Sequence, residues 1–194
     1  MEKRVLILLA DGFEEIEALT PADYLRRVGV DVTLCAIGNE RLVRGAHDIR
    51  VEADVLLENL ENSDEFDMLI LPGGMPGSTN LRDDDRVIRL VRAYDEAERW
   101  IGAICAAPII LEKAGITEGR AGTSYPGFEK TLGFRDYRED VVVRDGHLIT
   151  ARGPAAAVFF ALELARVLVG SKTADKLKND ILQTIVEKQL SDHC

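Results

Sequence analysis

Short apolar runs alternate with longer amphipathic segments along this chain. Continuous apolar runs are typical of strands buried on both faces of a parallel sheet. Segments with apolar residues at helical spacing, opened by proline or closed by glycine, are typical of helices. The pattern predicts strands at 4–10, 31–38, 66–74 and 100–104, and helices at 14–29, 83–99, 107–115, 154–170 and 173–190.

Two further segments predict β-hairpins. One spans 41–54 with its turn near Gly45, and the other spans 137–153 around Asp145-Gly146. Strand–helix alternation of this kind predicts a mostly parallel sheet with helices on both faces. In such sheets, sites form at the carboxyl ends of the strands. Three unusual stretches follow predicted strands, so their chemistry can converge there: ADGFEEIE, LPGGMPG and CAAP.

Composition and charge narrow the function classes. With 194 residues the chain is long enough for one sizeable domain, and we predict a single domain over 1–194. A net charge of −10 disfavours direct nucleic-acid binding and a basic membrane-surface helix. No apolar run approaches the length of a membrane span. The three cysteines are far apart and form no disulfide framework, which favours a reducing, cytoplasmic compartment.

Cys105 stands where the 100–104 strand meets the next helix. A free cysteine is most often a small buried packing residue. At this junction, however, the amides of a helix N-terminus would favour the thiolate and lower the thiol pKa. Alanines on both sides suit the tight turn of a nucleophile elbow. Cys35, inside a predicted strand, is expected in the core, and Cys194 is the last residue.

The other two stretches allow both structural and chemical interpretations. Glu14, Glu15 and Glu17 could simply favour the helix dipole, and helical spacing does not single out one of them. The glycines of LPGG could form only a turn. Alternatively, their amides could approach a substrate oxygen and, with the Ala106 amide, form an oxyanion hole. LPGG lacks the pattern of a phosphate-binding loop.

Histidines are scarce. His47, His147 and His193 make no metal-spaced cluster, so no metal site is predicted. His147 follows a hairpin turn and is expected at the surface. His47, in the first hairpin, is a candidate for a place near a site.

Taken in order, the stretches resemble the DJ-1/ThiJ/PfpI superfamily, closest to the branch with the parkinsonism-associated deglycase and the bacterial ThiJ-like proteins. The resemblance covers nearly the whole chain. It rests on ADGFEEIEALTPADYLRRVG, LPGGMPGSTNL, IGAICAAPIILEKAGI, TSYPGFE and DGHLITARGPAAAVFFALELARVLVG.

This resemblance implies a flavodoxin-like three-layer α/β sandwich, related to class I glutamine amidotransferases, that is usually a homodimer. Cys105 occupies the family's nucleophile position. The family's acid is the last glutamate of G-x-E-E-x-E, which is Glu17 here, and it is typically protonated and hydrogen-bonded to the cysteine. The amides of Gly74 and Ala106 would be the oxyanion donors. No metal or organic cofactor is implied.

Some positions depart from the family pattern. Tyr125 stands before Pro126 where many members have histidine, and a phenol cannot replace imidazole as a base at neutral pH. His47 stands where relatives often have arginine, which makes any anion pocket there weaker or pH-dependent. Together with Gly73, these residues (Tyr125, Pro126 and His47) are expected to bind substrate.

The resemblance implies glutathione-independent glyoxalase or deglycase chemistry on a small α-oxoaldehyde or a glycated adduct, with a role in stress protection. The alternative is a redox sensor or chaperone that uses an oxidisable Cys105. A PfpI-type peptidase is disfavoured because Ala106 replaces the histidine that follows the cysteine in that branch. A glutamine amidotransferase would need a downstream His-x-Glu, which is absent.

Overall fold

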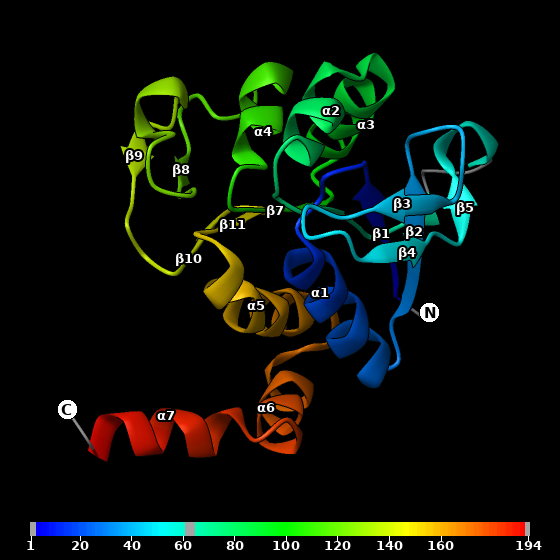
Figure 1. Cartoon of the computed structure of the whole chain (residues 1–194). Helices are drawn as coiled ribbons and strands as arrows, with labels where there is room; N and C mark the ends of the chain where they lie inside the picture. The colour runs from blue at the N-terminus through cyan, green and yellow to red at the C-terminus, as the bar shows by residue number, and fades with distance from the viewer. Residues whose placement is uncertain (1–2, 61–64, 193–194) are drawn as a thin grey trace.

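A computed structural model describes residues 3–60 and 65–192 and shows a central sheet between two layers of helices (Figure 1). The seven-stranded sheet has the order β10-β11-β7-β6-β1-β2-β5. Every pairing in it is parallel except that of β10 with β11. The predicted flavodoxin-like sandwich with a mostly parallel sheet is therefore confirmed. Its strands are β1 (Arg4–Leu9), β2 (Asp31–Ala36), β5 (Val55–Leu56), β6 (Met68–Leu71), β7 (Trp100–Ile104), β10 (Val142–Asp145) and β11 (Leu148–Ala151).

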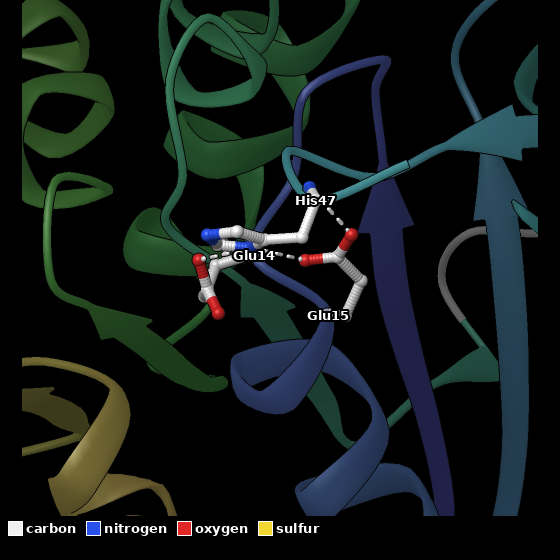
Figure 2. Close-up of side chains that lie close together, drawn as sticks. All are labelled: Glu14, Glu15 and His47. Carbon is white, nitrogen blue, oxygen red and sulfur yellow. Dashed lines mark hydrogen bonds and ion pairs between the residues drawn. The ribbon is translucent and has the colours of Figure 1, made fainter. Parts of the chain in front are cut away.

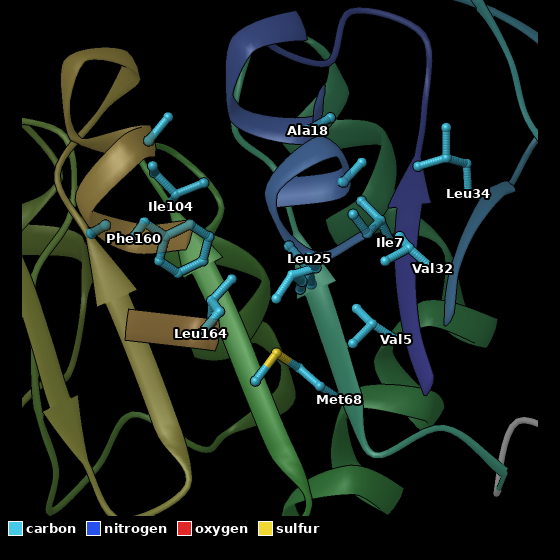
Figure 3. Packing of buried hydrophobic residues seen from close by; sticks show 14 of the residues in the cluster. Val5, Ile7, Ala18, Leu25, Val32, Leu34, Met68, Ile104, Phe160 and Leu164 are labelled. Atoms are coloured by element: carbon cyan, nitrogen blue, oxygen red, sulfur yellow. The ribbon is translucent and has the colours of Figure 1, made fainter. Parts of the chain in front are cut away.

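Each face of the sheet has its own hydrophobic core. Along β1, Val5 and Ile7 pack into the core beneath one helix layer, and Leu6 and Leu8 pack into the opposite core. Figure 3 shows the first of these cores, with Phe160 among its side chains. The first layer contains α1 (Glu15–Arg27), α5 (Ala157–Val169) and α6 (Ser171–Asp180). The second contains α2 (Gly77–Asp83), α3 (Asp85–Glu96) and α4 (Pro108–Ala114).

Smaller elements surround the sheet. The predicted first hairpin is formed by β3 (Leu42–Arg44) and β4 (Arg50–Glu52), which pair outside the main sheet. The Gly12 amide donates to Arg44 O at 2.7 Å, and the Ala46 amide donates to Phe13 O at 2.8 Å. These bonds hold the hairpin against the loop that leads into α1. The remaining short elements are β8 (Ala121–Gly122), β9 (Asp136–Tyr137) and the 3-10 turns Leu57–Asn59, Glu129–Thr131 and Pro154–Ala156.

The structure differs from the prediction in its last helix. The segment predicted as one helix at 173–190 is two helices, α6 and α7 (Gln183–Asp192). Leu182 between them has a φ of 63°, in the left-handed region, which ends the helical path. No glycine or proline marks this break. Within 3–60 and 65–192, no helix is long and apolar enough to span a membrane.

His147 is not the surface residue that the sequence predicted. Its Nε2 lies 2.7 Å from Asp95 Oδ1, and its side chain is only 16% exposed. The β10–β11 turn brings it against α3, whose Asp95 also accepts a hydrogen bond from Arg120 at 2.5 Å. His193 and Cys194 lie outside the described residues, whereas Cys35 is buried in the core as predicted.

Candidate active site

The three stretches that follow β1, β6 and β7 meet at one edge of the sheet. The Glu14 amide donates to Gly73 O at 2.9 Å, which joins the start of α1 to the glycine loop. The Glu17 carboxyl and the Cys105 thiol then face each other across this junction. The convergence expected for the carboxyl ends of parallel strands is present.

Cys105 lies in a strained turn between β7 and α4. Its φ is 64°, a conformation that L-residues other than glycine seldom adopt. Two backbone hydrogen bonds of 2.8 Å hold it there, because its amide donates to Ala151 O and its carbonyl accepts from the Tyr125 amide. This is nucleophile-elbow geometry, which presents the side chain at the end of the strand. The residue is 9% exposed.

Glu17 projects from α1 and is completely buried. Its Oε2 accepts a hydrogen bond of 2.9 Å from the Gly73 amide. Its Oε1 has no hydrogen-bond partner within the described part of the chain. A Cβ on residue 73 would overlap Glu17 Oε2 and would lie 2.7 Å from the Cys105 Cβ. Glycine at 73 is therefore what lets the loop approach both side chains.

Backbone amides also face the sulfur. The amides of Ala106 and Gly74 donate to Cys105 and favour its ionised form. These are the two amides that the resemblance assigned to an oxyanion hole. In this geometry the same donors can stabilise negative charge on the sulfur or on a substrate oxygen bound beside it.

The two side chains alter each other's ionisation. Burial raises the pKa of Glu17 to about 7, against smaller opposing effects of the Cys105 contact and the Gly73 amide. Burial, followed by the charge and hydrogen bond of Glu17, raises the pKa of the Cys105 thiol to about 12. The expected lowering of the thiol pKa is therefore wrong, because the amides of Ala106 and Gly74 only partly offset burial and the effects of Glu17. The two groups titrate as a pair.

An apolar hollow of about 400 Å³ lies beside the elbow. Tyr125 and Pro126, both singled out from the sequence, form one wall, and Phe159 contributes from α5. The tyrosine ring is half exposed. Gly153 and Pro154, which the sequence reasoning missed, also line the hollow, and a Cβ on Gly153 would lie 3.2 Å from the Tyr125 ring. They follow Ala151 by only a few residues, so the hollow opens next to the backbone that holds Cys105.

His47 lies with other partners. Figure 2 shows its ring beside Glu14 and Glu15, and its Nδ1 is 2.9 Å from Glu15 Oε2. The structure shows no contact between His47 and either Cys105 or Glu17 within the described residues, so a role for His47 in substrate binding stays a prediction. Sequence spacing could not reveal the cluster, because 32 residues separate His47 from Glu15.

Comparison with known proteins gives consistent matches over nearly the whole chain. The Drosophila melanogaster protein dj-1beta is 37% identical, over 94% of this chain and 98% of its own length. Its crystal structure superimposes with a TM-score of 0.88. A protein of Pyrococcus abyssi named a deglycase is 34% identical over 85% of this chain and 99% of its own length.

An oxidized DJ-1 structure from Toxoplasma gondii is 32% identical and superimposes with a TM-score of 0.89, covering 93% of this chain and 98% of that one. The sequence model of the DJ-1/PfpI family matches residues 3–167. With the elbow, the buried glutamate and these matches, the chain belongs to the DJ-1/PfpI family.

Proposed function

We propose that this protein is a cysteine-dependent, glutathione-independent glyoxalase or deglycase that acts on α-oxoaldehydes or their glycated adducts. The observation that carries the proposal is the buried Cys105–Glu17 pair, with two backbone amides donating to its sulfur. The relative from Pyrococcus abyssi named a deglycase supports the same reaction class.

The order of the two pKa values places the pair's single proton on Cys105 at rest, and the reactive form is the one in which this proton has moved to Glu17 and left Cys105 as the thiolate. The arrangement of donors supports this assignment. Two backbone amides face the Cys105 sulfur, where they stabilise negative charge. Glu17 Oε1, by contrast, has no hydrogen-bond partner among the described residues, and it gains one if it carries the proton. Protonation also removes the charge of Glu17, which is one of the causes that raise the thiol pKa.

The chemistry follows from this one-proton pair. The Cys105 sulfur attacks the aldehyde carbon of methylglyoxal and forms a C–S bond, and the aldehyde oxygen becomes an oxyanion beside the amides of Gly74 and Ala106. The oxyanion takes the proton from Glu17, which gives a hemithioacetal and leaves Glu17 as the carboxylate. This carboxylate, whose pKa is raised to about 7, then accepts the proton from the former aldehyde carbon and returns it to the neighbouring carbon, while the hydroxyl proton passes to the neighbouring oxygen. Water then hydrolyses the resulting thioester, which releases lactate and the thiol.

A glycated adduct would enter the same route. The sulfur displaces the bound amine from the adduct carbon, and Glu17 supplies the proton that the leaving amine needs. The apolar hollow at Tyr125 and Pro126 suits the small apolar end of such substrates. The net reaction consumes one water and gives a hydroxy acid and the free amine.

The test compares lactate formation from methylglyoxal by wild type, Cys105→Ser, Glu17→Gln and Glu17→Ala. Glu17→Gln keeps a hydrogen-bond donor beside the sulfur but cannot shuttle a proton. We expect it to keep iodoacetamide reactivity at Cys105 while losing turnover. Glu17→Ala, which has neither the donor nor the carboxylate, should also lose turnover. Full turnover in Glu17→Gln would exclude the proposed shuttle.

A redox-sensing role is the second candidate, and the same donors support it. Peroxide would oxidise the Cys105 thiolate to a sulfinate in two steps, each of which transfers one oxygen atom and releases water. The amides of Gly74 and Ala106, with protonated Glu17, are placed to hold the sulfinate oxygens. The test is mass spectrometry after graded peroxide treatment. This role requires a gain of two oxygen atoms at Cys105 before any other residue is modified.

We also propose that the protein is a homodimer. Ile16 on α1 is 53% exposed, and Leu42 and Ile49 from the β3–β4 hairpin region are also exposed. The turn of this hairpin lies against the start of α1, where the His47 amide donates to Glu15. An isologous contact between two copies would bury these apolar side chains.

A further inference from the structure

The cluster of Glu14, Glu15 and His47 includes neither Cys105 nor Glu17, although the charge of Glu14 acts on Glu17. Each of its three side chains offers one ligand atom, and these atoms lie within 4.8 Å of one another. Figure 2 shows the His47 ring lying between the two carboxylates, which come from the start of α1. The histidine comes from the turn of the β3–β4 hairpin.

Glu14 is the less well compensated carboxylate of the cluster. The residue is only 8% exposed, and its ion-pair partner within the described ranges is His47, with Nδ1 at 3.4 Å from Oε2. A largely buried carboxylate is stabilised by a neighbouring cation, and a divalent ion would supply more positive charge than one imidazole.

Glu15, by contrast, is held in place. Its Oε1 accepts the His47 amide at 2.8 Å, and Oε2 lies 2.9 Å from His47 Nδ1. The hairpin closes tightly around it, since a Cβ on Gly45 would overlap the Glu15 carboxyl group. One ligand is thus fixed, and a second, Glu14, is buried beside it.

The spacing fits a metal ion. An ion about 2.1 Å from two ligand atoms holds them about 3.0 Å apart at an octahedral angle and about 3.4 Å apart at a tetrahedral one. The two separations from His47 Nδ1, 2.9 Å to Glu15 Oε2 and 3.4 Å to Glu14 Oε2, match these values. The imidazole is 67% exposed, which leaves an entry path and room for water as further ligands.

We propose that Glu14, Glu15 and His47 form a binding site for one divalent transition-metal ion, with Zn²⁺ or Co²⁺ as the fitting ions. One nitrogen and two carboxylate oxygens suit these metals, whereas Ca²⁺ and Mg²⁺ prefer oxygen ligands alone. The proposal does not depend on turnover at Cys105.

Equilibrium dialysis with Zn²⁺ and the visible absorption of bound Co²⁺ test the site directly. Purified wild type, stripped with chelator, should bind one ion per chain. Glu14→Gln and His47→Ala should each weaken binding roughly tenfold or more. Glu40→Gln is the matched control, because it removes an exposed acid from the same region outside the cluster. Circular dichroism establishes that each variant is folded.

Cys105→Ser separates this site from metal capture by the thiol. We expect Cys105→Ser to bind the ion as wild type does, and the Co²⁺ spectrum to lack sulfur-to-metal charge transfer. Binding that survives both Glu14→Gln and His47→Ala, or that disappears in Cys105→Ser, would overturn the proposal. So would a stripped wild-type protein that takes up no ion at all.

Discussion

Replacing Glu17 by glutamine should change how the stability of the protein depends on pH. Glu17 is completely buried, and burial raises its pKa from 4.5 to about 7. The folded state therefore binds more protons than the unfolded state between these two values. The stabilisation from neutral Glu17 is fully present below about pH 4.5 and is lost as pH rises through about 7.

The expected size follows from the shift. A rise of about 2.5 pH units corresponds to roughly 3 kcal/mol of unfolding free energy, at 1.36 kcal/mol for each unit. Glutamine cannot ionise, so the Glu17→Gln variant does not undergo this loss of stability as the pH rises. Relative to wild type, the variant should gain up to roughly 3 kcal/mol between pH 4.5 and 8, even though its activity is lost.

Urea unfolding at fixed protein concentration, from pH 4.5 to 8, measures the difference between the two proteins. The contributions of other titrating groups to the unfolding free energy are the same in both proteins and cancel in the difference, apart from those of groups coupled to Glu17. Glu40→Gln is the control for making the same substitution at an exposed glutamate. A wild-type minus Glu17→Gln difference that does not change with pH would refute the assignment of a raised pKa to Glu17.

Three further predictions concern neighbouring features. Tyr125→Phe should cost one hydrogen bond at most, roughly 0.5–1.5 kcal/mol or about tenfold in kcat/KM on methylglyoxal, and a thousandfold loss would make the phenol catalytic. Iodoacetamide should label Cys105 faster than Cys35, because Cys35 is completely buried whereas Cys105 is 9% exposed and faces two backbone amides. Mass spectrometry of the labelled peptides measures the order, and faster labelling of Cys35 would contradict the proposed elbow chemistry. Light scattering should give wild type a mass of about twice the 21.4 kDa chain, and Ile16→Glu the mass of a single chain. If wild type and Ile16→Glu have the same mass, α1 does not lie in the interface.

Much of the fold could be predicted from local pattern. The continuous apolar run of β1 is buried because alternate residues enter two different cores, Val5 on one face and Leu6 on the other. The junction at Cys105 was also visible, as a strand pattern that changes to a helix pattern within a few residues. The break at Leu182 was not, because no glycine or proline marks it.

The active site could be predicted only in part from the local sequence pattern. Both Glu15 and Glu17 are buried, so helical spacing could not identify the acid that faces Cys105, and only the family resemblance selected Glu17. The thiol pKa was misjudged because burial and the approach of a carboxylate are tertiary effects. The contact of His47 with Glu14 and Glu15 was missed for the same reason, since the hairpin must fold over α1 before it forms.

The central claim is that Cys105 is the nucleophile and Glu17 its proton shuttle. The most direct measurement is kcat/KM for lactate formation from methylglyoxal, compared between wild type and Cys105→Ser. The account predicts a loss of at least about a thousandfold, equivalent to roughly 4 kcal/mol of transition-state stabilisation. Lactate formation by Cys105→Ser within about tenfold of wild type would show that the reaction does not pass through this cysteine.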